Sequence, residues 1–395
     1  MPNLRPWLNA LLCAAISLPA AGLIGVGTAH AAGPIVIGAT TSETGPLTED
    51  ADYQNRGIQL AIDVANEHGG WLGRKLELKL YDDKSDPGTA VRLYTRLITA
   101  DKVDLLIGPY SSGITQAVAP LINKYEYATI DPGGSLPDIF VAGNKWNLQG
   151  TASSLQYLDE VLPIAKKDGA STVAVLALKS AYSLACYKAR VEQAEKLGMK
   201  VVYQTTYSLP QPDFAAIGLA IKNAHPDVVL GCTYYPDAVG LTQALHNQGF
   251  APKYLAETIG PVEAAFGKAV GSLANGIISN TGWWANFKTP GNAAFVAAYK
   301  AKYNQAPDYH AATGYTAVAV LGDAVAATKS LDQKKIRDWL LHNHPEALLG
   351  TWKVSPNGLN EGFSQNLVQV QDGVIKLITP PDLAEAKLIV PYPGK

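Results

Sequence analysis

The sequence predicts an α/β protein built from two doubly wound lobes, each with a parallel sheet. Three observations predict this: short β-branched runs alternate with longer helical patterns, the alternation restarts after about residue 150, and a helix-rich tail follows. The chain has 395 residues, which is too long for one ordinary core and long enough for two.

The first series of elements precedes residue 131. Apolar residues at helical spacing predict a helix over residues 53–68, which Gly69-Gly70 ends. The other expected elements, in order, are strand 35–38, strand 76–80, helix 87–100, strand 104–107, helix 112–125 and strand 128–130.

The second series has the same alternation. It comprises helix 153–168, strand 172–178, helix 182–197, strand 200–205, helix 213–224, strand 227–231, helix 237–248 and strand 253–256. The tail differs, because three helices come without strands between them and a hairpin then turns at residues 371–373. Its expected elements are helices 291–303, 310–327 and 332–342, then strands 364–370 and 373–378. Such a tail suits a chain that returns to complete its earlier lobes.

Open α/β sheets bind ligands at the carboxyl ends of their strands, beside helix N-termini. Function is therefore expected in the loops that follow the strands, which are residues 41–52, 108–113, 131–138, 179–183, 232–237 and 257–262.

Composition and motifs exclude several function classes. Hydrophobic residues make up 47% and charged residues 17%, which permits large cores and argues against a disordered chain. The net charge of −2 gives no basic excess for binding nucleic acid. The sequence has no nucleophile elbow, phosphate-binding loop or zinc-protease motif, and its only Gly-rich match to a dinucleotide-binding fingerprint lies in the N-terminal apolar stretch, so we expect no catalytic residue and no cofactor. His342 and His344 form the one close histidine pair, which is expected to be a solvated helix end and not a metal site.

The N-terminus has the features of a signal peptide. Arg5 is followed by an uncharged apolar stretch, and Ala29-His30-Ala31 provides a cleavage site, so we expect export and removal of residues 1–31. A membrane anchor is the less favoured alternative because Pro19 and several glycines interrupt the stretch.

After removal of residues 1–31, two cysteines remain, Cys186 and Cys232. They could pair in an oxidising compartment, but two separately buried thiols are favoured.

One stretch is specific enough to suggest a family. Residues 66–75 (NEHGGWLGRK) and 81–87 (YDDKSDP) resemble the type I periplasmic solute-binding proteins, the branched-chain amino-acid-binding group that serves ABC transporters. Further matches, in the order of the family, are residues 44–47 (TGPL), 108–112 (GPYSS) and 234–237 (YYPD).

The resemblance implies two lobes joined by three crossings. Lobe one would comprise residues 33–151 and 282–349, and lobe two residues 152–281 and 350–395. It also implies a periplasmic, monomeric protein that holds an amino acid or small carboxylate and delivers it to the permease subunits of an ABC transporter.

The resemblance places the ligand carboxylate on lobe one. The matching residues are Ser112, with Tyr110 and Ser111 beside it, at a helix start whose free N–H groups suit an anion. The alternative is that Ser112 only caps its helix. Gly133 would offer a carbonyl and Ser135 a hydroxyl to the ligand ammonium, unless this loop is an ordinary turn.

Lobe two would close over the ligand with Tyr182 and Tyr234, and Glu257 would pair with the ammonium. Asp50 departs from the family, which has an aromatic residue there; it would either line the cleft and favour a polar or cationic side chain, or cap the following helix. Three alternatives stay open: an aromatic or aliphatic carboxylate, amide or urea as ligand; a sensor subunit; and an exported enzyme with a site assembled in three dimensions.

Overall fold

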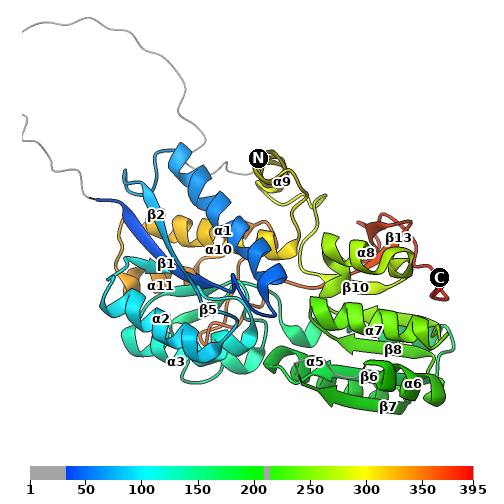
Figure 1. Ribbon diagram of the computed structural model, residues 1–395. Helices are drawn as coiled ribbons and strands as arrows, with labels where there is room; N and C mark the ends of the chain where they lie inside the picture. Colours follow the sequence, from blue (N-terminus) through cyan, green and yellow to red (C-terminus); the bar gives the residue numbers. More distant parts are fainter. Residues whose placement is uncertain (1–32, 209–213, 395) are drawn as a thin grey trace, which may run out of the picture.

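The computed structural model describes residues 33–208 and 214–394. The expected signal peptide lies outside the described residues. Figure 1 shows two lobes side by side, the first from the blue, cyan and orange parts of the chain and the second from the green and red parts. No helix within the described ranges is long and apolar enough to cross a membrane.

The sheet of lobe one is parallel. Its strand order is β2 (Leu76–Asp82), β1 (Ile35–Thr41) and β3 (Leu105–Leu106). A bridge between Ile107 and Ile130 extends it to the parallel pair β4 (Thr129–Asp131) and β5 (Asn147–Gln149).

Helices cover both faces of this sheet. One face packs on α2 (Pro87–Thr99) and α3 (Ser112–Tyr125). The other face packs on four helices, α1 (Thr48–Glu67), α9 (Asn292–Tyr303), α10 (Tyr309–Thr328) and α11 (Gln333–His342). The helices of the tail thus complete the first lobe, as the change of pattern after residue 290 suggested.

The sheet of lobe two has seven strands, of which five are parallel. From the parallel edge the order is β7 (Lys200–Tyr207), β6 (Thr172–Leu178), β8 (Val228–Cys232), β9 (Tyr254–Glu257), β10 (Ile278–Thr281), β13 (Asn366–Gln371) and β14 (Val374–Leu377). β13 and β14 form the expected hairpin, which pairs antiparallel with β10. The sheet is therefore mixed, with an antiparallel edge on a parallel centre.

Alternation along the strands divides the core of lobe two. Ala174 and Leu176 face the helices α6 (Phe214–Ala224), α7 (Tyr235–Asn247) and α8 (Ala264–Val270). Val173 and Val175 face α4 (Val161–Lys167) and the end of α5 (Ala181–Lys196). Both faces are apolar, which is why these strands appear as continuous hydrophobic runs in the sequence.

In this region one sequence expectation is wrong and one strand was missed. The helix expected over 153–168 is a 3₁₀ turn at Ser154–Gln156 followed by α4, because Leu158 has a φ of 58° that an α-helix cannot contain. The strand β10 was not expected, because its sequence ISNT is too polar to suggest a buried strand.

The expected second boundary of lobe one also differs from the structure. Residues 350–363 remain with lobe one: Trp352 and Phe363 pack in its core, and Asn360 donates to the carbonyl of Gln149 on β5. A short hairpin of β11 (Glu346–Ala347) and β12 (Gly350–Thr351) begins this segment. The chain therefore returns to lobe two after Phe363 and not at residue 350.

Candidate functional site

The carboxyl ends of both sheets face one enclosed space between the lobes, which we call the interlobe cavity. It measures about 20 Å³, roughly the space of one water molecule, so a ligand as large as an amino acid requires the lobes to separate. It is lined by Tyr110, Ser111, Ser112, Pro132, Gly133, Ser135, Thr151, Tyr157, Tyr182, Tyr234, Ile259, Tyr309 and His310. Seven of the nine residues that sequence reasoning assigned to the site are thus brought together.

The start of helix α3 forms one part of the lobe-one wall. Ser111 caps this helix: its hydroxyl accepts from the N–H of Ile114 at 3.4 Å, and its carbonyl accepts from the N–H of Thr115 at 3.0 Å. The N–H groups of Ser112 and Gly113 lie in the same first turn, where a helix provides no partner of its own. A helix N-terminus with free N–H groups attracts an anion such as a carboxylate.

The Ser112 hydroxyl joins two loops of lobe one. It accepts from the backbone N–H groups of Ser135 and Leu136 at 3.0 and 3.1 Å, and it lies 3.3 Å from the Ser135 hydroxyl. Ser112 therefore does not cap its own helix, which removes the simpler of the two readings considered for it. Both serine hydroxyls are held at fixed positions in the cavity wall.

The loop after β4 is organised by Asp131. One oxygen of its carboxyl group accepts from the N–H groups of Gly133 and Gly134 at 3.1 and 2.6 Å. Burial raises the pKa of Asp131 to about 7, against the effect of these hydrogen bonds. A side chain at Gly133 would lie 2.7 Å from the Pro109 carbonyl oxygen, so glycine is required for the two loops to meet.

The wall from lobe two is aromatic. Tyr182 and Tyr234 meet edge to face with ring centroids 4.8 Å apart. The Tyr182 hydroxyl donates to the Thr233 carbonyl and lies 2.8 Å from the Thr258 hydroxyl, so its position is set by the ends of β8 and β9. Burial raises the pKa of Tyr182 well above its usual value, which keeps the ring neutral.

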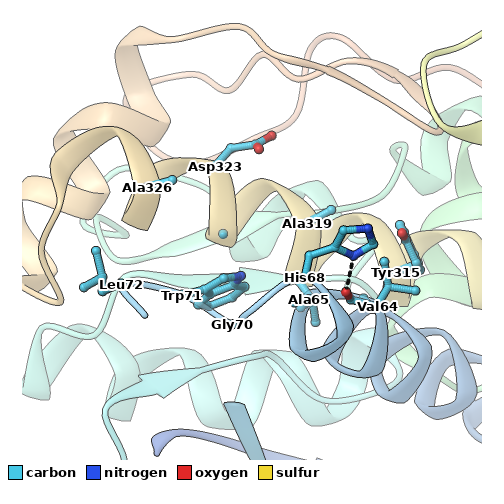
Figure 2. Close-up of a pocket in the computed structure, with 13 residues that line it drawn as sticks. Val64, Ala65, His68, Gly70, Trp71, Leu72, Tyr315, Ala319, Asp323 and Ala326 are labelled. Carbon is cyan, nitrogen blue, oxygen red and sulfur yellow. Dashed lines mark hydrogen bonds between the residues drawn. The ribbon is translucent and has the colours of Figure 1, made fainter. Parts of the chain in front are cut away.

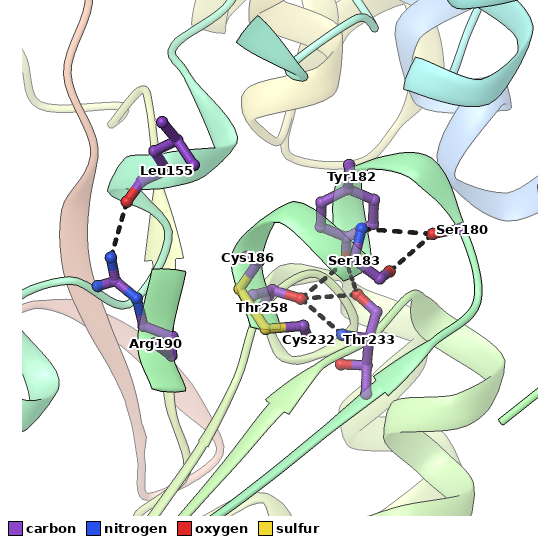
Figure 3. Close-up of a disulfide and its surroundings, with 9 residues drawn as sticks. All are labelled: Leu155, Ser180, Tyr182, Ser183, Cys186, Arg190, Cys232, Thr233 and Thr258. Carbon is purple, nitrogen blue, oxygen red and sulfur yellow. Dashed lines mark hydrogen bonds between the residues drawn. A yellow bond between two sulfur atoms is a disulfide. The ribbon is translucent and has the colours of Figure 1, made fainter. Parts of the chain in front are cut away.

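A disulfide joins the two segments that carry these tyrosines. Figure 3 shows Cys186 on α5 bonded to Cys232 at the end of β8, beside Tyr182 and Thr233. The expectation of two separate thiols is therefore wrong. Sequence spacing could not reveal the pair, because the two cysteines are 46 positions apart and only the βαβ path of the chain brings them together. The disulfide fixes Tyr182 relative to Tyr234.

Six cavity residues were not assigned from the sequence, and two of them, Pro132 and Ile259, lie in loops where function was expected. Thr151 and Tyr157 lie on the first crossing between the lobes, and Tyr309 and His310 begin helix α10. No motif marks them, because a crossing becomes part of a cavity only when both lobes are in place. His310 belongs to a hydrogen-bonded series in which its Nε2 lies 3.2 Å from the Tyr110 hydroxyl and its Nδ1 lies 2.9 Å from an Asp308 oxygen.

Glu257 does not face the interlobe cavity. It is buried below helix α7, where its Oε1 accepts from the Thr242 hydroxyl at 2.8 Å, and burial raises its pKa well above its usual value. β9 ends at Glu257 and Ile259 has a helical backbone conformation before the 3₁₀ turn Gly260–Val262, so the chain turns after the strand and Ile259 lines the cavity instead. Glu257 is thus not placed to pair with a ligand ammonium.

Asp50 lies in the first turn of α1 but does not cap that helix. Its side chain is fully buried, and it does not line the interlobe cavity itself. Its charge acts on Tyr110 and Tyr234, which do line the cavity, so Asp50 lies behind these rings.

A second hollow lies on lobe one alone, between α1 and α10. Figure 2 shows Trp71 and Leu72 at one end and the His68 ring, whose Nδ1 lies 2.8 Å from the Val64 carbonyl oxygen, at the other. It measures about 160 Å³ and is mostly apolar. It holds none of the expected site residues and is not at the carboxyl end of the sheet, so we do not assign the site to it.

Among residues 33–208 and 214–394, no group of three or more His, Cys, Asp or Glu side chains could hold a metal ion.

Comparison with known proteins fits this architecture. The sequence model of a family described as periplasmic binding protein matches residues 34–371 of this chain. The Leu/Ile/Val-binding protein homolog 7 of Brucella melitensis biotype 1 is 27% identical over 95% of this chain and 98% of its own length. A leucine-binding protein from Thermotoga maritima superposes with a TM-score of 0.80 at 24% identity over 88% of this chain and 99% of its own. A solute-binding protein of an ABC transporter from R. palustris, in complex with benzoate, superposes with a TM-score of 0.78 at 20% identity over 90% of this chain and all of its own. With two doubly wound lobes, a cavity at the strand ends of both and a family match over most of its length, the chain belongs to the periplasmic binding protein family.

Proposed function

We propose that this protein is the substrate-binding component of an ABC importer and binds an amino acid or a close analogue between its lobes. One observation carries the proposal: a helix N-terminus with two fixed serine hydroxyls lies opposite a pair of tyrosine rings in a space enclosed by both lobes. The first wall suits a carboxylate, and the second suits an apolar or aromatic side chain. The names of the Brucella and Thermotoga relatives support the same ligand class.

The proposed role is binding without reaction, in the periplasm. The ligand stabilises the closed arrangement of the lobes, and the closed protein delivers the ligand to the permease subunits as a monomer. Cleavage of the signal peptide after about Ala31 would release the mature chain, with a net charge of about −3. Mass spectrometry of the exported protein tests the cleavage site, and size-exclusion chromatography with light scattering tests the oligomeric state.

A ligand without an ammonium group is the second candidate. Ile259, and no carboxylate, faces the cavity from the end of β9, and five tyrosines line the same space. These features suit an aromatic carboxylate, and the structurally similar R. palustris protein is in complex with benzoate.

A thermal-shift screen of the mature protein with leucine, arginine, benzoate and urea separates these candidates. A ligand at 100 times its dissociation constant adds about 2.7 kcal/mol of stability. Stabilisation by an amino acid supports the first candidate, and stabilisation by benzoate alone supports the second. Unchanged melting with all four ligands would contradict both, and turnover of a bound ligand, seen by mass spectrometry, would indicate an enzyme.

A further inference from the structure

Two buried carboxyl groups meet where the lobes close. Asp50 comes from the first turn of α1 in lobe one, and Glu263 comes from the turn before α8 in lobe two. Their exposed fractions are 0% and 1%. The two carboxyl groups contact each other in a hydrogen bond that requires one of them to hold a proton, and none of their four oxygens accepts from any other donor among the described residues. Asp131, by contrast, is equally buried but has two backbone donors.

An unpaired buried carboxylate is costly, and two adjacent ones are more so. Burial is the main cause that raises the pKa of Asp50 and that of Glu263, and the charge of Asp50 raises the pKa of Glu263 further. A structural role would be served better by a pair of apolar side chains, so the pair is suited to a positively charged group that enters between the lobes.

The side chains around the pair reinforce this preference. Glu49 and Asp308 act on Glu263 as further negative charges. Of the basic side chains nearby, Arg56 pairs with Asp52 at 2.5 Å and Lys268 lines a hollow of lobe two together with Glu263, so the acids outnumber the bases. The local field is therefore negative and attracts cations into the cleft.

The pair adjoins the interlobe cavity. Ala51, the residue after Asp50, packs in the same buried cluster as Tyr110 and Tyr234, so the Asp50 carboxyl lies close to both rings. In agreement, burial first and then the charge of Asp50 raise the pKa of each of these tyrosines. Tyrosine faces attract organic cations, so a cation that passes these rings to reach the carboxyl groups remains in a favourable environment.

We propose that Asp50 and Glu263 form a subsite for the positively charged end of the ligand, so that the cleft accepts an amino acid or close analogue with a second ammonium or guanidinium group. This rests on the proposed function, because the carboxylate of the same molecule would occupy the helix α3 wall. A guanidinium offers five N–H donors to the four carboxyl oxygens and would replace the proton between them. Each lobe contributes one acid, so the cation would hold the lobes together.

Calorimetry tests the proposal with L-arginine, L-leucine and benzoate on the wild type, Asp50→Asn and Glu263→Gln. Wild-type protein should bind arginine at least about thirtyfold more tightly than leucine, as expected when a buried charge pair forms. Each variant should lose most of this preference and keep its affinity for leucine. Glu43→Gln is the matched control, because it removes an exposed acid of lobe one that is not among the charges acting on the pair and should keep the preference.

The variants should fold, because each replaces an unpaired buried acid with a neutral group of the same shape, and their melting temperatures check this. Equal affinity of the wild type for arginine and leucine would overturn the cation subsite while leaving the proposed function intact. Binding of benzoate but of neither amino acid would overturn both. An affinity for leucine that rises as the pH falls, without a preference for arginine, would show that protons and not a ligand cation neutralise the two acids, and would also overturn the subsite.

Discussion

The two walls of the interlobe cavity are built in different ways. The lobe-one wall consists of small residues on two loops, which are connected by hydrogen bonds among Ser112, Ser135 and Asp131. The lobe-two wall consists of the Tyr182 and Tyr234 rings, whose supporting segments are joined by a disulfide. Hydrogen bonds to backbone groups give the first wall fixed donors and acceptors, whereas a covalent bond gives the second a fixed apolar shape.

In the proposed function, the two walls serve different parts of ligand binding. Anion recognition needs donors at set distances, which a helix N-terminus and its neighbouring loop provide. Exclusion of water needs large apolar surfaces that keep their position while the lobes open and close. The Tyr182 and Tyr234 rings provide such surfaces, because a disulfide joins the segments that carry them. Predictions that disturb one wall at a time can separate these tasks.

Removal of the disulfide should have the largest effect on stability. The bond closes a loop of 46 residues, so Cys186→Ala with Cys232→Ala should lower the free energy of unfolding by about 4 kcal/mol. Urea unfolding followed by circular dichroism measures this. Cys186→Ala alone should cost nearly as much, since one cysteine cannot form the bond. A loss below about 1 kcal/mol in both variants would show that the disulfide contributes little to the free energy of unfolding.

Loss of the Ser112 hydroxyl should affect mainly the first wall. Ser112→Ala leaves two buried N–H groups unpaired, which should cost about 2 kcal/mol of stability and weaken the binding of a carboxylate ligand about tenfold or more. Ser111→Ala, which removes a helix cap, should cost about 1 kcal/mol and serves as the control for folding. Unfolding curves and calorimetry give both quantities. If ligand affinity is equal in the two variants, the role of the Ser112 hydroxyl is only structural.

Asp131 should make the first wall sensitive to pH. Its pKa is raised from 3.8 to about 7, so the folded state favours the protonated form, and the stability that this provides is complete below about pH 4 and lost as the pH rises to about 7. Asp131→Asn should reduce the fall in unfolding free energy over this range by up to about 1.4 kcal/mol per pH unit. Thermal unfolding at several pH values measures the slope. An unchanged slope would show that Asp131 ionises normally in the folded protein.

Substitution of Glu257 should have the smallest effect. Because Glu257 lies under α7 and not in the cavity, Glu257→Gln should change ligand affinity by less than about twofold and stability by roughly 0.5 kcal/mol or less. Calorimetry with the ligand found in the screen measures the affinity. A large loss of affinity without a change in melting temperature would show that Glu257 does contribute to ligand binding from the lobe-two wall.

Local patterns predicted much of the fold and part of the site. The helix that begins at Ser112 and the strand over residues 172–178 have the expected bounds, because helical periodicity and a β-branched run are properties of neighbouring residues. Ser112 and Tyr182 also reach the cavity as expected, since strand ends of an α/β sheet converge on one edge. The prediction for Glu257 failed because the turn that follows β9, at Ile259 and Gly260–Val262, decides which residue reaches the cavity, and local sequence patterns did not reveal that turn.

The sequence by itself determined the two α/β lobes, and the family resemblance added the helix start at Ser112 and the tyrosines of the opposite wall. Only the tertiary structure decided that Cys186 meets Cys232, that Tyr309 and His310 close the cavity, and that Asp50 faces Glu263. The physical reason is distance along the chain. Secondary structure follows from residues a few positions apart, whereas these three contacts join segments from about 46 to more than 200 residues apart, which only the packed lobes bring together.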